Sequence, residues 1–142
     1  MSSTSKVISE LCQLDFDALA AYEATLERIE EPSLKETIAT FRDDHQAHIE
    51  SLNQMLVQRS EDSVTEADFK KVLTKGKVVI AGLINDKAIL KAMVVNEEVT
   101  TKAYEKALDH DDFTPQERAT IERHWADEKR HKQWFSDAAD RL

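Results

Sequence analysis

Four long segments of this 142-residue chain each carry a stripe of core-forming residues at alternating steps of three and four. This spacing places every stripe on one side of an α-helix, so each segment predicts a helix with one face packed against its neighbours. The chain contains only two glycines and two prolines, which leaves the helices almost uninterrupted. The pattern therefore predicts an all-α protein built as a four-helix bundle.

Capping residues divide the chain into two helical pairs. Ser33 and Glu36 form a capping-box sequence at the start of the second helix, and Thr114 and Glu117 form another at the start of the last. Together with the stripes, these signals predict helices over residues 6–30, 33–60, 86–109 and 115–140.

The connection between the two pairs, residues 61–84, is too long for a hairpin turn. We expect it to run along the length of the bundle and to be partly helical, with a helix over 65–75 that Gly76 interrupts. Two antiparallel hairpins joined by one long crossover have the connectivity of ferritin-like folds. The expected organisation is thus a single ferritin-like domain over residues 1–142.

Each stripe is broken at one level by ionisable side chains. With a rise of about 1.5 Å per residue, these side chains lie roughly 20 to 28 Å from the turn within their pair, which puts them at matching heights. Buried charges destabilise a fold unless they are compensated, and a bound metal ion would compensate them. The candidate metal ligands are Asp15, His45, His48, Glu97, Glu128 and His131.

The types of these six residues restrict the metal. Three carboxylates and three imidazoles suit iron, manganese or zinc, whereas magnesium and calcium prefer oxygen ligands alone. Iron is the first expectation and manganese or zinc are alternatives. A dinuclear site is the leading interpretation, and a metal-free core with hydrogen-bonded histidines is the alternative to any metal site.

The two helical pairs look like copies of each other, which points to residues around the ligands. Asp44 and Asp127 each precede a candidate histidine by one helical turn and would orient it. His124 and the two tyrosines of the stripes are interpreted first as core residues, with a proton role open for the tyrosines. Glu23 and Glu105, which follow the tyrosines, lie roughly 10 Å nearer to the turns than the histidine pairs do. They are interpreted first as salt-bridge residues. The further candidates are therefore Asp44, Asp127, His124, Tyr22, Tyr104, Glu23 and Glu105.

At these positions the chain resembles the ferritin-like superfamily, including rubrerythrins, in which a Glu on each first helix joins a Glu-x-x-His pair on each second helix. Glu128 and His131 match that pair, and Glu97 matches its carboxylate partner. Asp15 is a shorter match, and His45 departs from the pattern because it stands where the superfamily has a carboxylate. The chain is also similar, along essentially its whole length, to a bacterial ferritin-like family of unassigned function, with residues 74–82, 86–93 and 96–97 carrying the likeness.

This resemblance implies a di-iron carboxylate centre that oxidises iron or consumes peroxide in a stress response. Asp15, Glu97 and Glu128 supply three negative charges, so one ion, or two ions with a bridging hydroxide or oxide, would balance them. His45 in place of a carboxylate favours the alternative of a non-catalytic helical stress or interaction protein with a degenerate or structural metal site. The sequence leaves the choice between enzyme and binding protein open.

Composition bounds the partners and the compartment. The formal net charge of −9 argues against a nucleic-acid binder, because phosphate neutralisation needs surplus lysine and arginine. Cys12 is the only cysteine, which excludes an intrachain disulfide and fits a reducing compartment. Met1 to Ser5 lead into no export signal, and no apolar run of membrane-spanning length occurs. We therefore expect a cytoplasmic protein whose partners are a metal ion and, as one option, a second copy of the chain in a dimer.

Overall fold

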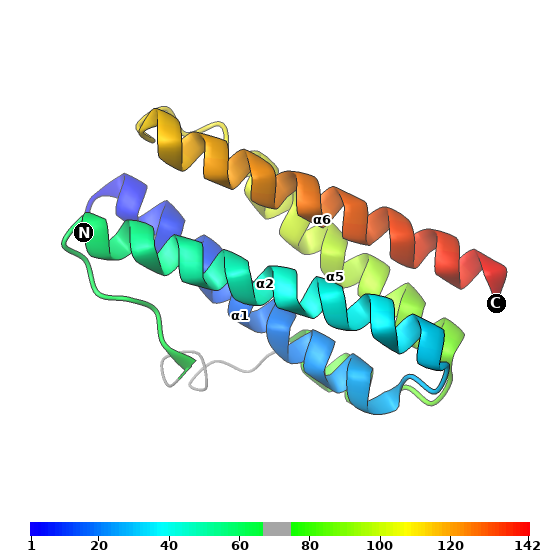
Figure 1. Ribbon diagram of the computed structural model, residues 1–142. Helices are drawn as coiled ribbons and strands as arrows, with labels where there is room; N and C mark the ends of the chain where they lie inside the picture. The colour runs from blue at the N-terminus through cyan, green and yellow to red at the C-terminus, as the bar shows by residue number, and fades with distance from the viewer. Residues whose placement is uncertain (67–74) are drawn as a thin grey trace.

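Helices form most of the computed structural model, which describes residues 1–66 and 75–142. The helices, labelled as in Figure 1, are α1 (Ser3–Arg28), α2 (Pro32–Gln58), α4 (Lys75–Ala81), α5 (Asp86–Ala107) and α6 (Pro115–Arg141). Figure 1 shows α1, α2, α5 and α6 as long rods lying side by side. The all-α four-helix bundle expected from the sequence is confirmed. In the described part of the chain, no helix is both long and apolar enough to cross a membrane.

The helix starts follow their capping side chains. The last helix begins with the expected capping box, in which Thr114 accepts from the amide of Glu117 and Glu117 accepts from the amide of Thr114. The capping box expected from Ser33 is wrong, because α2 begins one residue earlier at Pro32 and its cap is Glu31. Proline suits that first position, since the amide hydrogen it lacks has no helical partner there.

The connection between α2 and α5 is fixed at both ends. At its start, Asn53 on α2 makes two hydrogen bonds of 2.8 Å with the backbone of Val64. The helix expected over 65–75 lies mostly in residues 67–74, outside the described residues. Gly76 does not interrupt a helix but lies near the start of α4, where Ile80 is fully buried against α1 and α5.

The apolar core is divided into two clusters, one toward each end of the bundle. One contains Phe41, Met93 and Phe135, and the other contains Leu52 and Ile121. Ionisable side chains from all four long helices occupy the layer between these clusters. The four stripes therefore face a common interior, and their polar interruptions meet where the bundle is covered by apolar packing on both sides.

Candidate metal centre

The structure brings all six predicted ligands into this central layer. Asp15 comes from α1, the two histidines of the first pair from α2, Glu97 from α5, and the Glu-x-x-His pair from α6. None is more than 2% exposed. Six ionisable groups this deeply buried need compensation from one another or from a cation.

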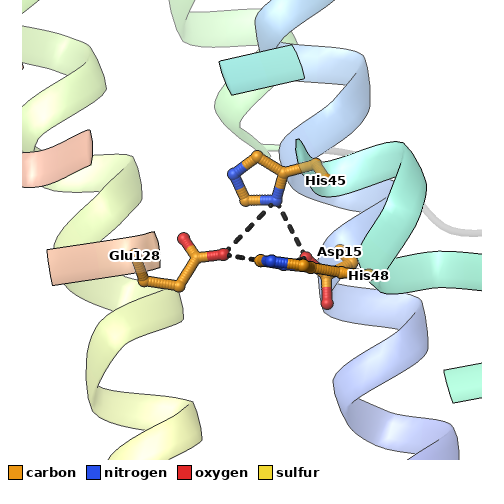
Figure 2. Close-up of side chains that lie close together, drawn as sticks. All are labelled: Asp15, His45, His48 and Glu128. Carbon is orange, nitrogen blue, oxygen red and sulfur yellow. Dashed lines mark hydrogen bonds and ion pairs between the residues drawn. The ribbon is translucent and has the colours of Figure 1, made fainter. Parts of the chain in front are cut away.

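One group of possible donor atoms gathers around Asp15, as Figure 2 shows. Asp15 Oδ1 lies 2.8 Å from His45 Nδ1 and 3.3 Å from His48 Nδ1. Glu128 Oε1 approaches from α6, 3.2 Å from His48 Nδ1 and 3.5 Å from His45 Nδ1. The ligand atoms of these four residues all lie within 4.8 Å of one another, close enough to hold one ion.

A second group gathers around Glu97 and shares two members with the first. Its residues are His45, Glu97, Glu128 and His131, again with ligand atoms within 4.8 Å of one another. His45 Nε2 lies 3.1 Å from Glu97 Oε1, and His131 Nδ1 lies 3.7 Å from Glu97 Oε2. His45 thus faces Asp15 of the first group with Nδ1 and Glu97 of the second group with Nε2.

Unsatisfied polar atoms test whether a cation fits this arrangement. Among the described residues, three buried side-chain polar atoms lack a hydrogen-bond partner, and two of them, Glu128 Oε1 and His131 Nδ1, belong to the cluster. Glu128 Oε1 has only its ion-pair contacts with His48 and His45, and a buried polar atom without a hydrogen bond costs about 1–3 kcal/mol. A metal ion accepts electron pairs from just these atom types, so the residues fit a bound cation.

Two aspartates hold the outer nitrogens of the histidines. His48 Nε2 lies 2.9 Å from Asp127, and His131 Nε2 lies 2.8 Å from Asp44. From the sequence, each aspartate was expected to orient the histidine one turn later on its own helix. Because α2 and α6 lie beside each other, each aspartate instead meets the histidine of the facing helix. In both histidines, Nδ1 therefore stays directed into the cluster.

Arg130 joins these two aspartates at the surface. Its guanidinium donates to Asp44 at 2.9 Å and to Asp127 at 3.2 Å. The sequence analysis missed Arg130, because its position between Glu128 and His131 marks it only as an exposed residue. It also missed Thr100, whose hydroxyl lies 3.0 Å from Glu128 Oε2. The signal for Thr100 was its place on the α5 stripe, one turn after Glu97.

The buried tyrosines cross from one half of the site to the other. Tyr22 on α1 donates its hydroxyl to Glu97 on α5, and Tyr104 on α5 donates to Asp15 on α1. The Tyr104 oxygen also lies 3.2 Å from His124 Nδ1. Each tyrosine thereby fixes the orientation of a candidate carboxylate ligand.

An aromatic ring covers each inward-facing histidine. His124 stacks on His48, with ring centroids 3.9 Å apart and an interplanar angle of 17°. Phe41 stacks on His131, with centroids 4.3 Å apart and an angle of 29°. The two rings take equivalent places, but only the histidine can form hydrogen bonds.

The remaining two candidates lie away from the cluster. Glu23 and Glu105 are both exposed. Glu23 forms an ion pair of 3.4 Å with Arg42 on the neighbouring helix. The structure thus separates these two residues from the other predicted site residues.

The charges in the cluster shift one another's pKa values. Burial opposes ionisation of Asp15, but hydrogen bonds with His45 and His48 outweigh it and hold the pKa of Asp15 well below its usual range. Burial and the nearby Glu97 charge raise the pKa of Glu128 well above its usual value. Burial disfavours the charged form of His48, but hydrogen bonds to Asp127 and Asp15 raise its pKa to about 9. Protons and a metal ion would therefore compete for the same atoms.

Comparisons with known proteins bear on the fold and the family. A family described as "Domain of unknown function (DUF2383)" matches residues 3–110, a range that includes Asp15, His45, His48 and Glu97 and ends before α6. The X-ray structure of Dps from Thermosynechococcus elongatus is similar, with a TM-score of 0.64 and 15% sequence identity over 96% of this chain and 94% of that chain. At this identity the likeness establishes a shared ferritin-like fold. No curated protein matches the sequence.

Proposed function

The chain belongs to the DUF2383 family of ferritin-like proteins, whose function is unassigned, and from its buried site we propose that it binds two transition-metal ions and oxidises them. Iron is the first candidate for these ions. One observation carries the proposal. Two four-residue donor groups share His45 and Glu128, and two of their buried polar atoms have no hydrogen-bond partner among the described residues.

The two ions would have matching ligands. Asp15 and His48 would hold the first ion, and Glu97 and His131 would hold the second. His45 and Glu128 belong to both donor groups and would serve both ions. Hydrogen bonds from an outer carboxylate to a ligand histidine fix its tautomer and make it more basic, which strengthens metal binding. The three carboxylates leave one positive charge on two divalent ions, and a hydroxide would balance it.

Iron at this centre would supply one-electron redox chemistry towards dioxygen or peroxide. With peroxide, two ferrous ions each give up one electron, and one hydrogen peroxide takes up both electrons and two protons to form two water molecules. The chain's own part would be to hold both substrate ions between the two apolar clusters, which limit contact with water from either end of the bundle. The tyrosine hydroxyls donate to Glu97 and Asp15 and would hold these carboxylates in position for the ions.

A second candidate function is metal binding without turnover. His45 favours it, because a neutral imidazole lowers the negative charge available to stabilise oxidised ions. On this alternative, the protein is a helical stress or interaction protein with a structural metal site.

The two functions are separated by adding ferrous iron and then hydrogen peroxide to the metal-free protein. The proposal expects two irons per chain, a new near-ultraviolet absorption band and consumption of peroxide. Glu128→Gln should abolish all three, whereas Glu122→Gln, an exposed position on α6, should behave like the wild type. Bound iron without absorption change or peroxide loss would establish the second function, and absence of bound iron, manganese and zinc would exclude both.

A further inference from the structure

The contact between α2 and α6, which we call the seam, is open beside the metal centre. A cavity of about 360 Å³ lies there, and small side chains leave room for it. His48, His124 and Asp127 form part of its wall. The other lining residues are Ala47, Ser51, Thr120, Arg123 and Ala126.

The opening continues along the seam towards the start of α6. A neighbouring cavity of about 620 Å³ shares Ser51, Thr120 and Arg123 with the first. Arg123 donates to Thr120 at 2.9 Å, so its guanidinium is held against α6 at the junction of the two cavities. Together the cavities form a passage along the seam that reaches the side chain of His48.

On the other side of Arg130, aromatic side chains fill the described part of the seam. There Phe41 covers His131, and Trp134 packs edge-on against Phe41 with centroids 5.4 Å apart. Phe135 also packs edge-on against Phe41 at 5.9 Å. The Arg130 guanidinium lies 5.5 Å from the centre of the Phe41 ring and covers it from outside. Three aromatic rings thus pack beside His131, whereas a cavity lies beside His48.

We propose that divalent metal ions enter and leave through the cavity at His48 and His124, so that the ion at Asp15 and His48 exchanges while the ion at Glu97 and His131 is retained. This inference rests on the metal centre of the proposed function. His48 belongs both to the cavity wall and to the first donor group, so an ion leaving that group meets water directly. Asp127 stands at the same wall with a carboxylate side chain 34% exposed, where it can attract a hydrated cation.

Zinc exchange tests the proposal without any redox chemistry, because zinc does not change its oxidation state. The protein is loaded with one zinc isotope and chased with another, and the retained isotope is followed by mass spectrometry. The wild type should lose two ions per chain in two phases, with rates that differ by at least about tenfold. Ala47→Trp narrows the cavity from the α2 side and should slow the fast phase by at least about tenfold while metal content stays unchanged.

Two further variants guard against indirect effects. Ala126→Trp narrows the same cavity from α6 and should reproduce the slow exchange. Gln46→Trp places the same ring on an exposed position of α2 outside the cavity lining and should exchange like the wild type. Two ions lost at one rate, or a fast phase unchanged in both cavity variants, would overturn this inference alone. Protein that takes up no metal would overturn the proposed function and this inference with it.

Discussion

The half-site at Asp15 and His48 and the half-site at Glu97 and His131 are built from the same parts. In each, an inward Nδ1 faces the cluster, an aspartate from the facing helix holds Nε2, and a tyrosine from the other half holds the carboxylate. They differ in the ring that covers the histidine, since His124 stands in the first half where Phe41 stands in the second. A repeated helical hairpin thus supplies the geometry, and single substitutions make its two halves chemically different.

The shared residues differ as well. Glu128 lies in the Glu-x-x-His pair of α6, and His45 takes the corresponding place on α2. His45 contacts Asp15 with one nitrogen and Glu97 with the other. When both nitrogens carry protons, the imidazolium links the two carboxylates by two hydrogen bonds, which Glu128 has no means to do.

Making the halves alike at this position should have the largest effect. His45→Glu replaces a residue that compensates two carboxylates by a fourth carboxylate, so the metal-free protein should lose about 3–5 kcal/mol of unfolding free energy. Zinc should restore most of the loss, because four carboxylates balance two divalent ions. Urea unfolding with and without zinc measures both effects. Gln46→Glu, exposed on the same helix, should change neither, and an unaltered stability of His45→Glu would show that His45 is not the compensating charge.

Removing the histidine of one half-site at a time should abolish binding of one ion and leave the other bound. His48→Ala should remove the rapidly exchanging ion and leave the slow one, and His131→Ala should do the reverse. Each variant should keep about half of the wild-type zinc after gel filtration, since only one of the two inward nitrogens is lost. Loss of both ions from either variant would mean that the two positions fill only together.

Removing the tyrosine hydroxyls should have a smaller effect on the unfolding free energy. Tyr104→Phe removes a hydrogen-bond partner from both Asp15 and His124, whereas Tyr22→Phe removes one from Glu97 alone. A lost hydrogen bond to a buried charged group costs about 1–3 kcal/mol, so Tyr104→Phe should be the more destabilising of the two. Urea unfolding of the metal-free variants compares them directly. Equal losses would indicate that His124 contributes nothing through Tyr104.

Counted per pH unit, the smallest effect should be the pH dependence of metal binding. The pKa of His48 is raised to about 9, so the imidazole keeps its proton below that pH and a metal ion must displace it. Zinc affinity should rise by about tenfold per pH unit up to pH 9 for each displaced proton, and this term should then level off. Calorimetry in buffers of different ionisation enthalpy counts the released protons. An affinity that does not change between pH 6 and about 9 would contradict the protonated state of His48.

The fold was predictable because its determinants are local. The four stripes fix which face of each helix is buried, and the six ligand candidates could be expected to meet because their heights follow from their positions along the helices. The start of α2 was misplaced because proline is typical both of the end of one helix and of the first residue of the next, and Pro32 was assigned to the end of the first helix. The sequence analysis did not expect α4, because it interpreted Gly76 as the end of a helix and gave less weight to the apolar residues after it.

The surroundings of the site were less predictable, because they depend on contacts between helices. Spacing along the chain put Asp44 next to His48, but packing of α2 against α6 pairs Asp44 with His131. The same limit hid Arg130, whose role depends on two aspartates from different helices. The cavity at His124 was also beyond the sequence, since small residues open a space only where the facing helix has small residues too.

Arg130 couples the deeply buried site to the ionic strength of the medium. Its side chain is 54% exposed, yet it holds both aspartates that hold the outer nitrogens of His48 and His131. Dissolved salt weakens ion pairs at such exposed positions, so added salt should loosen the support of both histidines together. A site buried inside the bundle thereby remains responsive, through one surface guanidinium, to the electrolyte around the protein.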